Sequence, residues 1–286
     1  MARPTVLILT GLALAAFAAN SILCRLALRT ALIDPVSFTT IRLLSGAVML
    51  GCILWFRGQR PGGNWVSALA LFAYAIGFSL AYVGLPAGAG ALLLFGAVQV
   101  TMLGHGLHAG ERLNRWQLVG LLLAAAGLAW LLWPRQSAPG GQAISIGSAL
   151  SMLAAGIAWG IYSLRGKRSG DATTATAGNF MRTVPMALVV LALFHPSHAD
   201  RDGVLYAIAS GALASGIGYA IWYSALPALG AMTAGIVQLS VPILAAAAGA
   251  LLLGEAVTVQ LLVAGVAVIG GVLLALLRAT PLRDRA

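Results

Sequence analysis

Several polar side chains interrupt the long apolar stretches of this sequence. Asn20, Gln99 and Gln238 place amide groups there, and Arg42 and Arg182 place guanidinium groups. Such groups are costly in hydrocarbon, so they either bond across helices or face a wet pathway for a solute. For the two arginines both interpretations stay open: a long stem that reaches the membrane boundary or makes a structural hydrogen bond, or a cation that steers a carboxylate or forms a gate.

Aromatic side chains recur at helical spacing. Tyr74, Phe78 and Tyr82 are four residues apart, and so are Tyr219 and Tyr223, which places each set on one helix face. Such walls suit bulky apolar solutes, and their ring faces attract an ammonium group by about 0.5–2 kcal/mol. For Tyr82 and Tyr223, which are close to predicted helix ends, the alternative is an interfacial belt.

The acidic residues all lie in connections or at the ends of the apolar stretches. They are Asp34, Glu111, Asp171, Asp200, Asp202, Glu255 and Asp284. A proton-driven exporter usually relays protons through a buried Asp or Glu, and a purely cationic solute would need a buried counter-ion. The absence of a carboxylate near the middle of any apolar segment favours a neutral or zwitterionic solute. It also favours transport down the gradient of the solute, without obligatory coupling to protons.

Signals for metal, cofactor or catalytic chemistry are weak. Two groups combine histidines with an acid: His105, His108 and Glu111, and His195, His198 and Asp200. Neither group has cysteine partners or a complete ligand set, so we interpret both as polar residues at the membrane boundary, with His105 as a candidate gate or proton carrier. The sequence also lacks the G-x-x-x-x-G-K-[S/T] loop that binds ATP. We expect no cofactor, no metal and no enzyme activity.

The composition indicates which elements must position these side chains. Of 286 residues 60% are hydrophobic, with only 17 Lys or Arg and 7 Asp or Glu. A soluble domain of this length would carry roughly 70 charged residues. We therefore expect a lipid bilayer and a small-molecule substrate as partners, and a monomer or homodimer. The net charge of +10 does not indicate nucleic acid, because the basic residues are scattered between apolar runs.

Ten apolar segments are long enough to cross a membrane. We predict helices at 5–28, 36–56, 65–85, 87–107, 116–133, 146–164, 174–194, 204–225, 231–253 and 258–277. If the amino terminus is cytoplasmic, eleven Lys and Arg residues fall on the inner side and four on the outer side. The outer four are Arg25, Arg29, Arg135 and Arg201. This asymmetry predicts that both termini are cytoplasmic.

The sequence also contains an internal repeat. Leu85-Pro86 and Val98-Gln99 recur about 140 positions later as Leu226-Pro227 and Val237-Gln238. In this register the candidate cavity-lining residues pair across the copies: Asn20 with Trp159, Phe78 with Tyr219, Tyr82 with Tyr223, and Gln99 with Gln238. Each copy, 1–137 and 138–286, has five helices, and an odd number makes the second copy enter the membrane from the opposite side. We predict an all-α membrane protein with two inverted five-helix repeats around a central cavity.

Short motifs in both copies resemble a known family. Gly110-Glu111 and Gly254-Glu255, each followed by a glutamine, resemble the end of the fourth helix of an EamA repeat, and Trp159-Gly160 resembles its first helix. The whole chain is thereby similar to the EamA branch of the drug/metabolite transporter superfamily and, within it, to YddG-type amino-acid exporters. The resemblance implies ten helices, a central cavity and a bacterial inner membrane. The first copy departs from the second because it has no proline that matches Pro242.

From these features we expect a secondary transporter that exports small zwitterionic or neutral metabolites, foremost amino acids including aromatic ones, by alternating access. Within the same class, drugs or nucleotide-related solutes stay open as substrates. A membrane-embedded transferase would need a nucleophile or a metal cluster near the lipid, which we do not find in the sequence. A passive channel is a third alternative, which substrate saturation and counterflow in liposomes would distinguish from a carrier.

Overall fold

A computed structural model describes residues 3–108, 115–133, 145–166, 171–194, 198–229 and 237–277. Within these residues the regular secondary structure is helical, apart from an isolated β-bridge between Ile33 and Ala199. The elements in chain order are α1 (Arg3–Arg29), α2 (Pro35–Phe56), α3 (Trp65–Tyr82), α4 (Ala87–His108), α5 (Arg115–Leu132), α6 (Ile146–Gly166), α7 (Ala172–Phe194), α8 (Arg201–Ile208), η1 (Ala209–Ile217), α9 (Gly218–Ala225), η2 (Leu226–Ala228), α11 (Ser240–Leu253) and α12 (Val259–Leu277).

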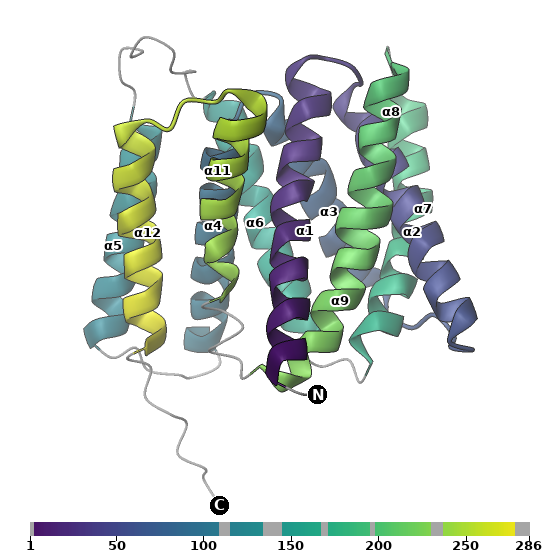
Figure 1. Cartoon of the computed structure of the whole chain (residues 1–286), viewed down its shortest axis with the longest axis horizontal. Helices are drawn as coiled ribbons and strands as arrows, with labels where there is room; N and C mark the ends of the chain where they lie inside the picture. Colours follow the sequence, from purple (N-terminus) through teal and green to yellow (C-terminus); the bar gives the residue numbers. More distant parts are fainter. Residues whose placement is uncertain are drawn as a thin grey trace, which may run out of the picture.

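The helices run side by side along one direction and form a single bundle (Figure 1). α1 packs against α9, η1 and α11, while α3 packs on α6 and α2 on α7. α5 and α12 pair with each other at one edge of the bundle. We call the end at which α1 begins the lower end, and the opposite end, where α1 stops and α11 leads into α12, the upper end.

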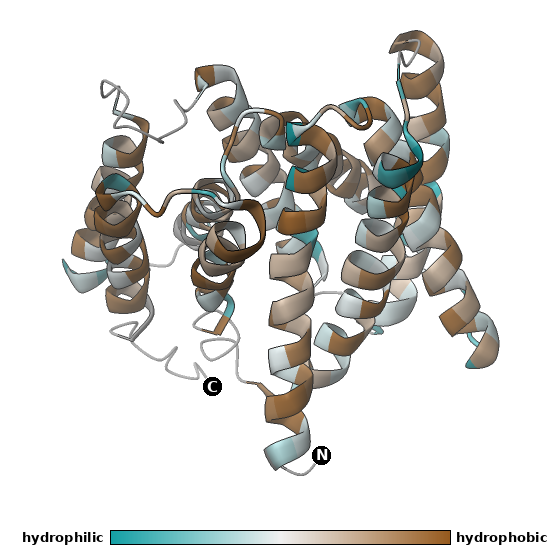
Figure 2. Cartoon of the chain, turned by 45° about the horizontal axis from the view of Figure 1, so that its top comes forward, coloured by the Kyte–Doolittle hydropathy of each residue, from teal (hydrophilic) through white to brown (hydrophobic). Residues whose placement is uncertain are grey.

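The described helices have apolar outer surfaces. Seven of them are long and apolar enough to cross a membrane, and three shorter apolar stretches lie in α4, α11 and α12. Large apolar side chains face outward, as in Leu251 and Phe56, which are 84% and 80% exposed. Hydrophobic residues cover most of the helix lengths, and hydrophilic residues gather mainly near the ends (Figure 2). Helices surrounded by lipid require this distribution, whereas a water-soluble surface would not tolerate it.

All ten predicted segments coincide with a helix, although the ninth, 231–253, begins in residues that the structure does not describe. The eighth, 204–225, differs from the uniform α-helix that its apolar pattern predicts. It starts as α8, widens into the π-helix η1 and continues as α9. π-helices are rare and occur often at functional sites. Gly211 in η1 lies directly against the backbone carbonyl of Arg42 in α2, where any side chain would overlap that carbonyl.

Polar residues at the helix ends fix where the helices begin and stop. Asp34 and Asn64 each precede a helix, and their side-chain oxygens accept hydrogen bonds from backbone N–H groups in the first turns of α2 and α3. α11 stops at Gly254, whose φ of 64° lies in the left-handed region that glycine adopts without strain. This turn places Glu255 directly above the end of α11.

Glycines bring α5 and α12 into close contact. Gly120 on α5 and Gly271 on α12 face each other, so that a Cβ at either position would overlap the backbone carbonyl of the other. The neighbouring Gly270 has open space where its Cβ would be. Small residues at a crossing allow helix backbones to approach closely, which is the main source of packing energy between helices in lipid.

We therefore expect Gly271→Ala to destabilise the protein by about 1–3 kcal/mol, because the added methyl group forces the two helices apart. Gly270→Ala is the matched control, and it should leave the stability unchanged or raise it slightly, since alanine favours a helix over glycine. Thermal unfolding of the two purified variants in detergent measures the difference. Equal melting temperatures would contradict the close α5–α12 crossing.

Candidate functional site

A narrow cavity lies inside the bundle, between α1, α3, α4, α6, the η1–α9 helix and the residues just before α11. Its volume is about 20 Å³, which is room for about one water molecule. Its lining residues are Phe17, Asn20, Ser21, Tyr74, Phe78, Leu94, Phe95, Trp159, Ala214, Tyr219 and Gln238. A metabolite does not fit in this volume.

Aromatic rings form most of the cavity wall. Trp159 of α6 lies at their centre, with its ring centroid 4.8 Å from that of Tyr74 on α3 and 5.3 Å from that of Tyr219 on α9. Phe78 lies 5.3 Å beyond Tyr74, and Phe17 of α1 lies 5.7 Å from Tyr219. These separations are typical of favourable tilted and edge-to-face contacts. Four helices thus contribute to one continuous aromatic wall.

Hydrogen-bonding groups accompany the rings. The Oδ1 atom of Asn20 accepts a hydrogen bond from the Ser210 hydroxyl in η1 (2.6 Å), and its Nδ2 atom donates to the Tyr74 hydroxyl (3.4 Å). Gln238, which precedes α11, adds a second amide to the lining. Among the described lining residues none carries a charge. The cavity therefore offers ring faces, amides and hydroxyls to a solute.

A buried cation lies behind this wall. Arg42 of α2 is 2% exposed, and its guanidinium carbon lies 5.3 Å from the ring centroid of Tyr74 and 4.9 Å from that of Phe78. Its Nη2 atom donates to the Tyr74 hydroxyl (3.1 Å), whereas its buried Nη1 atom has no hydrogen-bond partner. The side chain thus ends against the cavity wall and does not extend to the membrane boundary.

Five of the predicted site residues therefore meet at the cavity: Asn20, Phe78, Trp159, Tyr219 and Gln238. Gln99, the predicted counterpart of Gln238, does not. It lies in the middle of α4 beside a gap of about 10 Å³ among α4, α5 and α12. The two amides separate because α4 is one continuous helix whose Gln99 faces α5, whereas Gln238 precedes the start of α11.

Two tyrosines that the sequence also placed in the lining do not reach the cavity. Tyr82 is fully buried one turn above Phe78, and its hydroxyl donates to the backbone carbonyl of Ala87 (3.3 Å). Tyr223 is partly buried in α9 and packs against the core, outside the set that lines the cavity. The cavity is thus lined by Phe78 and Tyr219, and not by Tyr82 and Tyr223 one turn further along the same helices.

The remaining candidates lie at the lower end. The Nη1 atom of Arg182 donates to the backbone carbonyls of Gly62 (2.5 Å) and Gly178 (2.8 Å), so it fastens the α2–α3 loop to α7. His105 is exposed in the last turn of α4. Its predicted neighbour Glu111 and the outer histidine His195 lie outside the described residues. Within the described part of the chain, no three His, Cys, Asp or Glu side chains group closely enough to hold a metal ion.

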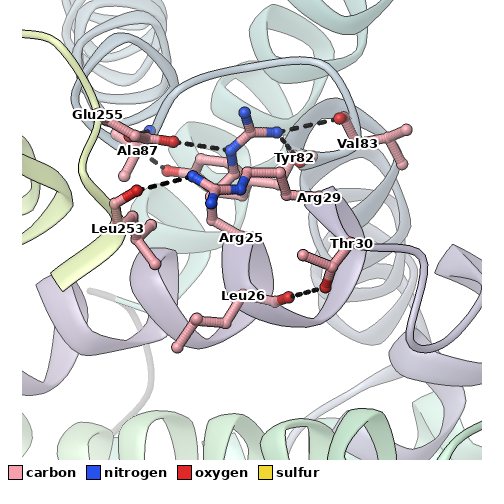
Figure 3. A network of polar contacts seen from close by, with 9 residues as sticks. All are labelled: Arg25, Leu26, Arg29, Thr30, Tyr82, Val83, Ala87, Leu253 and Glu255. Carbon is pink, nitrogen blue, oxygen red and sulfur yellow. Dashed lines mark hydrogen bonds and ion pairs between the residues drawn. The ribbon is translucent and has the colours of Figure 1, made fainter.

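An ion pair joins helices at the upper end (Figure 3). Arg25 of α1, 1% exposed, donates from Nε to Glu255 Oε1 (2.8 Å) and from Nη1 to the carbonyls of Tyr82 and Val83 (3.0 Å each). The other carboxylate oxygen of Glu255 accepts from the backbone N–H of Ala87 (2.7 Å). We call this set the upper latch. It ties α1, the α3–α4 turn and the α11–α12 loop together above the cavity.

The sequence did not reveal this latch, because Arg25 was counted among the outer charges that set topology. Its partner Glu255 belongs to the Gly254-Glu255 motif, 230 positions away in the sequence. A pair that distant has no spacing signal of its own. Arg29, one turn further along α1, reinforces the junction by donating to the carbonyl of Leu253 (2.9 Å).

We expect Glu255→Gln to loosen the upper end, because loss of one partner leaves the Arg25 charge buried without a counter-charge. The native Cys24 reports the opening, since it is 0% exposed and lies beside Arg25. In a Cys52→Ser background, which removes the exposed cysteine, a hydrophilic maleimide should alkylate Cys24 roughly tenfold faster or more in the variant, which corresponds to about 1.4 kcal/mol of lost closure.

Arg29→Gln is the matched control, because it removes a single bond from a more exposed arginine at the same junction. It should raise the alkylation rate of Cys24 far less than Glu255→Gln does. An unchanged rate in Glu255→Gln would mean that the latch does not hold the upper end closed.

Comparisons with known proteins add independent information. A profile of the EamA-like transporter family matches residues 5–133 and 146–277. The chain is 54% identical over 275 residues to an uncharacterized protein of Pseudomonas aeruginosa, with 94% of both chains covered. It is 24% identical over 260 residues to the uncharacterized transporter YoaV of Bacillus subtilis, covering 84% of this chain and 86% of that one.

A third relative is a probable amino-acid metabolite efflux pump of Salmonella typhimurium, 26% identical over 212 residues and covering 69% of this chain and 70% of the pump. A solved crystal structure superposes with a TM-score of 0.68 at 21% identity, over 98% of this chain and 100% of the other. This likeness shows a shared fold.

Proposed function

Because the chain belongs to the EamA-like transporter family, and is thus a multi-pass membrane protein, we propose that it exports small zwitterionic or neutral metabolites, foremost amino acids including aromatic ones, by alternating access. The observation that carries the proposal is the central cavity, whose described lining combines aromatic rings with amides and hydroxyls and contains no carboxylate. The aromatic rings suit an apolar side chain of the solute. The amide groups can form hydrogen bonds with the ammonium and carboxylate groups of a free amino acid.

The proposed architecture is ten membrane-spanning helices in two inverted repeats, 1–137 and 138–286. The family profile matches one stretch in each half. The helix contacts support the same arrangement, because α3 packs on α6 as η1–α9 packs on α1, and α4 packs on α6 as α11 packs on α1. In transporters built this way the solute binds between the halves near the middle of the membrane.

The proposed orientation places both termini in the cytoplasm of a bacterium, with the protein in the inner membrane as a monomer or homodimer. The excess of Lys and Arg on the predicted inner side supports this choice. The upper latch then closes the cavity toward the outside. A contracted cavity below a closed end fits a carrier that opens to one side at a time, since a channel would need a continuous path.

The name of the Salmonella relative, a probable amino-acid metabolite efflux pump, supports amino acids as the substrate class. Proton coupling is not part of the proposal. Within the described residues no carboxylate lies in the middle of a helix, and the buried Glu255 is already paired with Arg25. Transport would then follow the gradient of the solute.

The test is counterflow in proteoliposomes with a panel of amino acids and no imposed pH gradient. We expect saturable uptake of labelled phenylalanine or leucine into vesicles preloaded with the same unlabelled amino acid. Protein-free vesicles provide the control. Strict dependence on a proton gradient would contradict uncoupled transport, and no exchange with any amino acid would contradict the proposed substrate class.

We also expect Trp159→Ala to lower the transport rate roughly tenfold or more, because it removes the ring at the centre of the aromatic wall, and such contacts are worth about 0.5–1.5 kcal/mol each. Gln238→Ala should lower it less, by the loss of one amide. Trp55→Ala is the matched control, since Trp55 is 75% exposed on the outer face of α2. All proteins are compared after size-exclusion chromatography, and unchanged rates in both cavity variants would remove them from the solute pathway.

A further inference from the structure

Arg42 is a buried cation with an incomplete set of partners. No carboxylate of the described residues pairs with it, in contrast to Arg25, which is paired with Glu255. Its contacts are the Tyr74 hydroxyl and the faces of Tyr74 and Phe78, and its Nη1 atom is left without any hydrogen bond. Burial of a charge or of an unpaired donor costs free energy unless a partner is supplied.

The two rings that shield this cation are also part of the cavity wall. Tyr74 and Phe78 line the cavity on one side and contact the guanidinium on the other. A metabolite is larger than the 20 Å³ available, so the lining would have to open for a solute to enter, and Tyr74 and Phe78 are part of that lining. Separation of Tyr74 and Phe78 would uncover the guanidinium, whose Nη1 atom has no hydrogen-bond partner.

Building on the proposed function, we propose that Arg42 binds the carboxylate of the transported solute. A guanidinium presents paired N–H donors that match the two oxygens of a carboxylate, which would both neutralise the charge and satisfy Nη1. The side chain of the solute would then lie along the wall formed by Trp159 and Tyr219, whose ring faces also attract its ammonium group. The site selects solutes that carry a carboxylate and rejects purely cationic amines.

The experiment measures binding to the full chain in lipid nanodiscs. The probes are L-phenylalanine and L-leucine, each compared with its carboxamide, which keeps the ammonium group and the side chain but lacks the carboxylate. We expect the wild-type protein to bind each acid roughly tenfold tighter or more than its amide, because a hydrogen bond to a charged group is worth more than one to a neutral group.

Arg42→Met tests the assignment directly. A buried charge can be replaced by an apolar side chain of similar size without loss of folding. In this variant the affinity for the acid should fall to about the affinity for the carboxamide. Arg42→Lys keeps the positive charge but lacks the paired N–H donors of a guanidinium. It should restore part of the preference for the acid over its carboxamide. The control is Arg165→Gln, an arginine at the lower end that bonds to Ser67 and Asn64, which should keep the wild-type preference.

Equal affinity of the wild-type protein for acids and amides would overturn the inference, and so would a preference for acids that survives in Arg42→Met. Amino acids that bind and exchange without any effect of Arg42 would leave the proposed function intact and remove only this site. If the wild-type protein binds neither the acids nor the amides, the proposed function itself fails and the carboxylate site with it.

Discussion

The pairing of polar groups inside a lipid-surrounded bundle governs this structure. Helices surrounded by lipid have no water to bond their interior polar groups, so each such group must find a partner in the protein. Asn20 meets this requirement by joining Ser210 to Tyr74, and Arg182 does so with two backbone carbonyls. The bonds of Asn20 link α1 to η1 and to α3, and the bond of Arg182 to Gly62 links α7 to the α2–α3 loop. The polar side chains thereby help to fix the positions and rotations of the apolar helices relative to one another.

Two arginines on adjacent helices meet this requirement to different degrees. Arg25 pairs with Glu255 and donates to two backbone carbonyls, and these bonds join three segments at the upper end. Arg42 is only partly satisfied, by a hydroxyl and by ring faces beside the cavity. Removal of one partner from a buried ion pair leaves a costly unpaired charge, and a buried charge that is incompletely paired gains from an added partner. In the proposed transport cycle Arg25 helps to close the upper end and Arg42 binds the solute.

Small residues and one irregular helix determine how closely several helices approach one another. Glycines at helix crossings let α5 approach α12 and let η1 lie against α2. The π-helix shifts the residues that follow it relative to a regular α-helix, and both Ser210 and Ala214, which face the Asn20 side of the cavity, belong to it. The large rings then occupy the remaining space. In the proposed transport cycle a solute would bind only after the lining opens, which would couple binding to a change of conformation.

The sequence alone determined which segments form helices, because runs of apolar residues longer than a membrane crossing have few alternative structures. It also identified the helix faces that carry Asn20, Phe78, Trp159, Tyr219 and Gln238, since helical spacing follows directly from residue numbers. The tertiary structure alone decided that Gln99 faces α5 and not the cavity, that Arg25 meets Glu255, and that residues 209–217 form a π-helix. These features depend on helix rotation, depth and contacts between distant segments, and local periodicity carries no information about them.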